Sequence, residues 1–442
     1  MTGQSAPGGT SLRWLGARRR APALPLAWAL VAFAATPGVC AQAPASPPDT
    51  LRLAEAIAIA RAANPMLRAD RLRAMAASER VAPAGAWNDP ELTLGLINRP
   101  LGGSGMTEPM TMNTVRLAQM VPWPGTRSRA RSAADALADA DSLDVLDAEA
   151  MLEARVAAGY HRLAAIDATL GVMEETLRLL DGLRAMAMAR YGAGEAPQQD
   201  VLQAQVNAAR MEADLVAMRG ERLAEAARFN ALLAREPWAP IGALPVAEHL
   251  PVLPPVDSLA MLAESRRPAL AAAAARTRAA GHEVARTRRE AYPDLMVAAE
   301  YGQRSRFDDM ATLMVGVRVP VFARSRQRPM QREREAMHAM AEAMAVQLHS
   351  ETWALLAEGH AMADRAARLT ALYDTRILPQ VRAAAEAAQS AYRAGTADVM
   401  TLLESQMTHN RVRIERIRLV AEFHSAWAEI RALLGSAGEG RP

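Results

Sequence analysis

The sequence predicts a mainly α-helical protein with a small membrane β-barrel portion, built as a tandem repeat that combines a β-hairpin with a long coiled-coil helical hairpin. Three observations predict this fold class. Short motifs recur in the same order about 200 residues apart. Four short segments alternate apolar with small or polar residues, as strands do. Two long tracts carry apolar residues at helical spacings of three and four.

Residues 1–41 are predicted to be a signal peptide, so the mature protein is expected to be exported. Four arginines precede an apolar stretch over residues 21–35, and small residues follow at a spacing that suits cleavage after Ala41. Cleavage there removes four positive charges and no acidic residue, which takes the formal net charge from +3 to about −1. The single cysteine, Cys40, lies in the same region; its acylation is the alternative, but Val39 fits a lipoprotein signal poorly.

Five pairs of motifs carry the repeat, and the members of each pair lie 198–203 residues apart. The pairs are Asn64–Leu67 with Arg267–Leu270, Pro90–Leu92 with Pro293–Leu295, Val121–Pro122 with Val319–Pro320, Tyr191–Gly194 with Tyr392–Gly395, and Ala231–Leu233 with Ala432–Leu434. Their common order predicts a first structural repeat over residues 51–236 and a second over residues 256–436. Residues 237–255 are a proline-rich linker, in which a helix is excluded.

Both repeats are predicted to hold the same elements in the same order. These are a helix (residues 51–80 and 258–289), two strands (residues 91–97 and 113–121, then 294–301 and 313–321) and a helical hairpin (residues 127–234 and 326–435). The first hairpin carries a coiled-coil seam of Leu163, Ile166, Leu170, Met173, Leu177 and Leu180. Gly194 and Gly395 are expected to end the long helices, because glycine suits the left-handed position that follows a helix.

The strands suggest a transmembrane barrel that one chain cannot close alone. Leu92, Leu94 and Leu96 share one strand face, as in an outer-membrane barrel. About eight strands form the smallest such barrel, and lipid tolerates no open strand edge, so several chains have to contribute. Six aromatic residues lie within residues 87–123 and 292–322, as an interfacial belt requires. The alternative is a soluble β-layer packed on helices.

The order of helix, strand pair and long hairpin, given twice over residues 51–436, resembles the TolC-type outer-membrane efflux proteins. The motifs that carry the resemblance are Gln119–Gly125, Tyr191–Glu195 with Asp200–Gln205, Phe229–Leu233, and Tyr392–Thr396 with Leu403–Gln406. The resemblance implies a homotrimeric tunnel with a twelve-stranded barrel in the cell outer membrane and helices that extend into the periplasm. It also implies a passive exit duct that docks to a periplasmic adaptor protein and an inner-membrane pump.

The Pro-Trp-Pro-Gly form of residues 122–125 resembles the branch that serves heavy-metal pumps of the resistance-nodulation-division class, such as cobalt–zinc–cadmium and copper–silver systems. Heavy-metal cations are therefore the expected cargo. Export of drugs or secreted polypeptides is the alternative within the same class of channel. A periplasmic coiled-coil adaptor is the alternative from another class, but two tandem hairpins with membrane-like strands argue against it.

The resemblance further implies which tip residues have a function. Tyr191, Gly194 and Gly395 mark the turns at the tunnel tip that dock the adaptor. Asp200 and Tyr392 match the positions where family members link the two hairpins of a closed tip. The alternative for this pair is a solvated aspartate and a packing tyrosine.

Further candidates lie in the second hairpin and beside the strands. Glu404 matches an inward-facing acid, and three copies would form a carboxylate ring that favours cations; the alternative is a plain surface carboxylate. Trp87, Trp123, Pro124 and Gly125 are expected at the membrane interface. Arginines follow the last strand of each repeat, where outer-membrane lipid headgroups are the expected partner and solvated arginines with nearby acidic residues are the alternative: Arg127, Arg129, Arg131, Arg324, Arg326, Arg328, Arg332 and Arg334.

No pattern in the sequence indicates catalysis or a cofactor. The sequence carries no phosphate-binding loop, nucleophile triad or catalytic carboxylate pair, so we expect no enzyme activity. The eight histidines form no ligand-like cluster in the sequence, and methionines such as Met337 and Met340 have the helical spacing of core residues, so no metal site is expected. A nearly neutral mature chain also gives no reason to expect a nucleic-acid partner.

Overall fold

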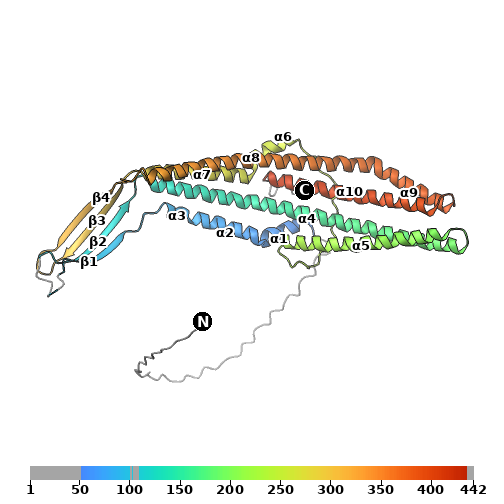
Figure 1. Ribbon diagram of the computed structural model, residues 1–442, viewed down its shortest axis with the longest axis horizontal. Helices are drawn as coiled ribbons and strands as arrows, with labels where there is room; N and C mark the ends of the chain where they lie inside the picture. The colour runs from blue at the N-terminus through green and yellow to red at the C-terminus, as the bar shows by residue number, and fades with distance from the viewer. Residues whose placement is uncertain (1–50, 100–101, 103–108, 436–442) are drawn as a thin grey trace, which may run out of the picture. The chain divides into compact units, whose positions relative to one another are not determined.

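The structure is a computed structural model that describes residues 51–99, 102 and 109–435. The predicted signal peptide and Cys40 lie outside the described residues. Every described residue belongs to one unit of the chain, Pro47–Pro442. Within this unit, two successive sets of helices and strands follow one another (Figure 1).

The two sets have closely similar element orders. The first is α1 (Leu53–Ala63), α2 (Pro65–Glu79), α3 (Val81–Ala84), β1 (Glu91–Ile97), β2 (Met112–Val121), α4 (Thr126–Gly192) and α5 (Gln198–Leu232). The second is α6 (Val256–Arg266), α7 (Pro268–Arg289), β3 (Asp294–Gln303), β4 (Met310–Arg318), α8 (Gln327–Leu372), the π-helix η1 (Tyr373–Ile377), α9 (Leu378–Arg393) and α10 (Val399–Leu433). The mainly helical class with a small β portion is confirmed.

A proline breaks each of the predicted leading helices. The stretch expected to be one helix over residues 51–80 divides at Asn64, and that over residues 258–289 divides at Arg267. Proline disfavours the α conformation in the residue before it, and the ψ angles of Asn64 and Arg267 are 119° and 117°. The prediction of unbroken helices was wrong because this restriction outweighs the helical pattern.

The second long tract, over residues 326–393, is also interrupted. The π-helix Tyr373–Ile377 lies directly before Pro379, which is in the first turn of α9. Proline cannot donate a backbone hydrogen bond, and the wider π turn accommodates the missing donor. The tract therefore consists of two α-helices joined by one wide turn.

The last strand lies three residues earlier than expected. β4 spans Met310–Arg318 rather than residues 313–321, and its last pair sets Arg318 opposite Asp294. Pro320 cannot donate to a strand ladder, so the alternating pattern continues past the point where pairing stops. Val319 and Val321, which the pattern assigned to the strand, lie beyond its end and are exposed.

The four strands form one antiparallel sheet in the order β1-β2-β3-β4. β2 pairs with β3 from Asn113 opposite Gln303 to Val121 opposite Leu295, so the sheet runs on from the first set of elements to the second. β1 and β4 are its edges. Their apolar side chains are largely exposed, among them Leu94 at 73% and Leu313 at 74%.

The helices are ordered around α4, whose 67 residues correspond to about 100 Å of helix. α4 contacts α2 and α5, and it also contacts α7 and α10. α8 contacts α7 and α10 in turn. In Figure 1 the strands lie at one end of α4, and the α4–α5 and α9–α10 turns lie at the other.

The core consists of three main clusters: one joins α1, α4, α5 and the 237–255 linker, one joins α4 and α5 to α9 and α10, and one lies between α6, α8 and α10. The predicted seam of α4, from Leu163 to Leu180, is buried or partly buried. The Asp167 carboxylate accepts hydrogen bonds from Arg222 and, at 3.0 Å, from the Leu244 amide, while Arg222 donates to the Ile241 carbonyl at 3.0 Å. This network fixes the linker against the hairpin. Across the described part of the chain, no helix combines the length and apolar character needed to cross a membrane.

Candidate functional site

Two turns at the end of the helices away from the sheet share one backbone geometry. Gly194 and Gly395 have φ angles of 78° and 75°, a left-handed conformation that glycine adopts without steric cost. The Gly194 amide donates to the Tyr191 carbonyl at 2.9 Å, and the Gly395 amide donates to the Tyr392 carbonyl at 3.1 Å. A Cβ at either glycine would enter open space, so both turns are accessible to a partner.

The two tyrosines beside these turns have different surroundings. Tyr191 is 48% exposed, whereas Tyr392 is 6% exposed. The Tyr392 ring belongs to an apolar cluster that includes Val399 and Leu402 of α10. On another side, the Arg190 guanidinium carbon lies 5.4 Å from the centroid of the Tyr392 ring. Tyr392 is therefore held between the second hairpin and the end of α4.

The predicted pair of Asp200 and Tyr392 lies on two different hairpins of the chain. Asp200 lies in the first turn of α5, where a negative charge suits the helix dipole. Among the described residues, no hydrogen bond joins its carboxylate to the Tyr392 hydroxyl. Glu404 lies near the start of α10, and its side chain is exposed.

At the sheet end, aromatic residues hold the junction between strands and helices. Trp123, between β2 and α4, stacks on Tyr292, with ring centroids 5.0 Å apart and an interplanar angle of 14°. The Trp123 amide also donates to the Asp294 carboxylate at 3.0 Å. The Arg127 guanidinium carbon lies 3.8 Å from the centroid of the Trp87 ring. Both predicted interface tryptophans therefore contact the strand–helix junction.

The neighbouring Gly125 has a left-handed backbone, which favours glycine. Its φ angle is 88°, and a Cβ there would lie 2.6 Å from Nε of Arg289. Pro124 and Gly125 line a pocket of about 460 Å³ together with Trp87 and Trp123. The four predicted interface residues therefore share one surface at the end of the strands.

The arginines that follow the two strand pairs are not equivalent. Arg127 is partnered within the chain, because it also donates to the Gly85 carbonyl at 2.7 Å. After β4, Phe322 is 74% exposed. The exposed arginines that follow it are Arg324, Arg326, Arg328 and Arg332. This second junction therefore presents apolar and cationic groups side by side.

Midway along the helices, two histidine rings stack between α4 and α10. The centroids of His161 and His424 are 4.6 Å apart, at an interplanar angle of 20°. Burial, with a smaller contribution from the neighbouring His424, lowers the pKa of His161 to about 4. Burial also lowers the pKa of His424. Both rings are therefore neutral at pH 7. Sequence reasoning missed this pair because 263 residues separate its members.

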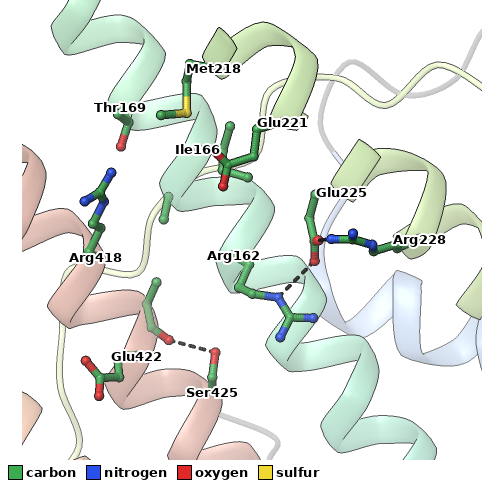
Figure 2. A pocket seen from close by; sticks show the side chains of 12 residues that line it. Arg162, Ile166, Thr169, Met218, Glu221, Glu225, Arg228, Arg418, Glu422 and Ser425 are labelled. Atoms are coloured by element: carbon green, nitrogen blue, oxygen red, sulfur yellow. Dashed lines mark hydrogen bonds and ion pairs between the residues drawn. The ribbon is translucent and has the colours of Figure 1, made fainter. Parts of the chain in front are cut away.

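A pocket of about 700 Å³ lies between α4, α5 and α10, and Figure 2 shows the side chains that line it. Its buried Glu225 accepts hydrogen bonds from Arg162 at 2.9 Å and from Arg228 at 3.1 Å. Three arginines and three glutamates line the pocket: Arg162, Arg228, Arg418, Glu221, Glu225 and Glu422. Because these charges balance, the pocket does not select a ligand by charge. Within the described ranges, no group of three or more His, Cys, Asp or Glu side chains is arranged to hold a metal ion.

The fold is shared with solved outer-membrane channels. OprN is 19% identical with a TM-score of 0.74, and the match covers 87% of this chain and 90% of OprN. CusC is 15% identical with a TM-score of 0.75, covering 86% and 91%. VceC of Vibrio cholerae is 18% identical with a TM-score of 0.73, covering 87% and 96%. No curated protein sequence is significantly similar to the chain.

The sequence matches the family model of outer membrane efflux proteins twice, over residues 56–235 and over residues 259–436. The two matches together cover most of the chain, and the shared fold of the solved channels agrees with them. This is a family of transport conduits rather than a class of enzymes. The chain therefore belongs to the outer membrane efflux protein family of TolC-type channels and is located in the outer membrane.

Proposed function

We propose that the chain is the exit duct of a tripartite efflux system, a passive conduit that forms a homotrimer and works with a periplasmic adaptor and an inner-membrane pump of the resistance-nodulation-division class. One observation carries the proposal: the sheet and the helix layer both end in unpaired edges. β1 and β4 are the sheet edges. In the helix layer, α2 and α5 flank α4, and α8 lies beyond α7 and α10. A second copy therefore fits both edges at once, and repetition of this contact closes a ring.

Strand number supports three copies. Two copies would give eight strands, and a barrel of about eight strands is filled by its own side chains. Three copies give twelve strands and leave a lumen. The length of the strands suits a membrane, since the ten residues of β3 extend about 33 Å, which a tilt of about 40° reduces to about 25 Å.

The repeat predicts how the strands of two copies pair. β2 and β3 meet at the boundary between the two repeats, with Ala118 opposite Ala298. The motif offset of 198 residues relates Ala118 of β2 to Gly316 of β4, and the offset of 203 residues relates Ala298 of β3 to Gly95 of β1. The same pairing between copies therefore sets Gly316 of one copy opposite Gly95 of the next. In this register the exposed leucines of β1 face the exposed valines of β4. Small residues thus meet small ones and apolar residues meet apolar ones.

The helix edges support the same contact. Met337, Met340 and Met344 on α8 are exposed, and so are Leu72 and Met75 on α2. By the repeat, α7 is equivalent to α2 and α4 is equivalent to α8, and within one chain α7 packs on α4. α2 of the next copy therefore covers the methionines of α8, where their flexible side chains adapt to the facing helix.

The aromatic and cationic residues support an orientation in the membrane. Trp87, Trp123 and Tyr292 lie at the helix end of the strands, while Tyr301 and Phe307 lie near the β3–β4 loop. The aromatic residues therefore lie near both ends of the strands, as two interfacial belts require. The exposed arginines after Phe322 then lie at the periplasmic level, where phospholipid phosphates bind cations.

The tip residues supply the proposed docking and gating positions. The exposed turns at Gly194 and Gly395, with Tyr191 beside the first, meet the adaptor. Glu404 is exposed near the tip, and three copies bring three carboxylates together, which favours passage of cations. Asp200 is a further gating candidate, through its place in the first turn of α5.

We propose heavy-metal cations as the cargo, on the form of the Pro122–Gly125 motif. The test is deletion of the gene followed by growth on zinc, cadmium, cobalt, copper and silver, alongside dyes and antibiotics. Sensitivity to metals alone supports this cargo. Unchanged metal tolerance together with new drug sensitivity would show that the channel serves drugs instead.

Cysteine cross-linking tests the ring. Leu94→Cys combined with Val317→Cys, a pair opposite one another in the predicted register, should give covalently linked dimers and trimers on oxidation. Leu94→Cys with Leu313→Cys is the matched control, because Leu313 lies on the same strand but four residues away. Efficient cross-linking of the control pair alone would refute the register. A monomer released without detergent would refute the channel.

A further inference from the structure

The linker between the two repeats crosses the helix layer from one edge to the other. Contacts between the helices give the layer the order α5, α4, α10 and α8. Near the start of the linker, the Ile241 carbonyl accepts from Arg222 of α5 at 3.0 Å. The Leu244 amide then binds α4, and near the end of the linker the His360 ring of α8 donates to the Pro254 carbonyl at 3.1 Å. The linker therefore begins at the α5 edge and ends at the α8 edge.

At the α5 edge, the linker presents a tryptophan on a fixed turn. Trp238 is 81% exposed. The Ala239 amide closes the turn by donating to the Glu236 carbonyl at 2.9 Å. The side chain of the fully buried Asn230 donates to the carbonyls of Pro237 and Ala239 at 3.2 and 2.8 Å. A large apolar ring is thus held in water by a rigid backbone, so that little conformational entropy is lost when a partner covers it.

At the α8 edge, the linker presents a second apolar side chain. Val252 is 91% exposed. The backbone around it is restricted by Pro251, Pro254 and Pro255. The neighbouring Leu253 is partly buried against the cluster between α6, α8 and α10. The linker therefore ends as it begins, with an exposed apolar side chain on a restrained backbone.

The repeat indicates that the two exposed side chains lie at one level along the helices. The end of α5 packs at Gly159 of α4, where an added Cβ would lie 3.1 Å from Phe229. The end of α10 packs in the same way at Gly359 of α8, where a Cβ would lie 3.1 Å from Ile430. These glycines are 200 residues apart and mark equivalent levels of the two long helices. Trp238 lies six residues beyond the end of α5, and the linker binds α8 one residue after the second glycine.

We propose that Trp238 of one copy packs on Val252 of the next, so that the three linkers form a closed belt around the middle of the duct. The inference rests on the proposed function, in which the α5 edge of one copy meets the α8 edge of the next, and it adds residues that lock the ring. Within one chain α10 packs on α4, so by the repeat α5 of one copy packs on α8 of its neighbour. The contact removes from water two apolar side chains that the single chain leaves exposed.

Disulfide formation between introduced cysteines tests the contact in the full-length protein. Trp238→Cys combined with Val252→Cys should give covalently linked dimers and trimers when the detergent-solubilised protein is oxidised. Trp238→Cys with Glu248→Cys is the matched control, because Glu248 is also exposed but lies in the middle of the linker. The control pair and each single variant should run as monomers on a denaturing gel.

The same contact should slow the dissociation of the trimer. Tryptophan is among the side chains that most often dominate the stability of an interface. Trp238→Ala should therefore speed the dissociation of trimers in dilute detergent by about 10- to 30-fold, as the loss of one such residue does. Trp238→Phe keeps an aromatic ring and should dissociate much more slowly than Trp238→Ala.

The strand pair of Leu94→Cys and Val317→Cys separates this inference from the ring itself. If the strand pair cross-links and the linker pair does not, the belt is refuted and the ring stands. If neither pair cross-links, the ring is refuted and the belt with it. If Trp238→Ala leaves the trimer as stable as the wild type but lowers its co-sedimentation with isolated peptidoglycan, the tryptophan binds cell-wall glycan and the belt is refuted.

Discussion

The stacked histidines predict that the protein loses stability between pH 6.5 and pH 4. His161 has a folded-state pKa of about 4 against an ordinary value of 6.5, chiefly because burial disfavours the imidazolium. Between these two values the unfolded chain binds a proton that the folded chain does not. The free energy of unfolding therefore falls as the pH falls through this window, and it is unaffected by His161 above it.

The size of the effect follows from the difference between the two pKa values. About 2.5 pH units at 1.4 kcal/mol each correspond to about 3 kcal/mol per chain for His161. His424 adds to the effect in the same direction, since burial lowers its pKa as well. His161→Phe keeps a planar ring against His424 and removes the proton site. The variant should match the wild type near pH 7 and exceed it in stability near pH 4.

Thermal unfolding of the detergent-solubilised protein at pH 7, 6, 5 and 4 measures this difference. The carboxylates titrate in both proteins, so only the divergence between the wild-type and His161→Phe midpoints reports the histidine. His349→Gln is the control, because the His349 side chain is 44% exposed and far from the pair in sequence. Parallel curves for the wild type and His161→Phe would refute the reasoning.

Two further predictions concern the fold. Gly125→Ala should destabilise the protein by about 2 kcal/mol, because the alanine Cβ meets Arg289 and the residue has a positive φ. Gly171→Ala, in the exposed interior of α4, should stabilise it by about 0.5 kcal/mol. Thermal midpoints measure both variants, and equal shifts would contradict the account. Asp167→Ala should cost about 3 kcal/mol of stability, because it leaves the largely buried Arg222 without its carboxylate partner. Limited proteolysis of this variant should then cut within residues 237–255, which Asp167 anchors through the Leu244 amide. A linker that stays uncut would count against this anchoring.

The parts of the fold that the sequence predicts are those that depend on neighbours along the chain. The seam through Leu163 and Leu180 follows from helical periodicity, and the turns at Gly194 and Gly395 follow from the one residue type that tolerates a positive φ. The breaks at residues 64 and 267 were equally local. Apolar spacing alone does not predict them, because the helical pattern continues across the restriction that proline places on the residue before it.

The site is less predictable, because its contacts join residues that are distant in the chain. Arg190 and Tyr392 are 202 residues apart, and Trp123 and Tyr292 are 169 apart. Whether Arg190 meets Tyr392 depends on the rotation of each long helix about its axis, which periodicity fixes only to a face. Family resemblance pointed to Tyr392 and offered Asp200 as its partner. In the single chain the ring instead faces a cation, because the last turn of α4 directs Arg190 toward it.

The two helix breaks look alike in sequence but are stabilised differently. At the first, the Asn64 side chain accepts from the amides of Met66 and Leu67 at 3.0 and 3.1 Å and donates to the Leu232 carbonyl at 3.3 Å. Asn64→Ala removes a helix cap, which costs about 1 kcal/mol. At the second break, Arg267 is 7% exposed and lies 3.6 Å from the Asp147 carboxylate.

Arg267 should therefore matter more than Asn64. Burial raises the pKa of Asp147, and Arg267 opposes that rise, so each charge depends on the other. Arg267→Ala leaves the carboxylate without its cation and should cost about 3–5 kcal/mol, whereas Arg267→Met combined with Asp147→Leu removes both charges and should recover most of that loss. Thermal midpoints at pH 7 measure all three variants. If Arg267→Ala costs no more than Asn64→Ala, the buried pair does not hold the second break.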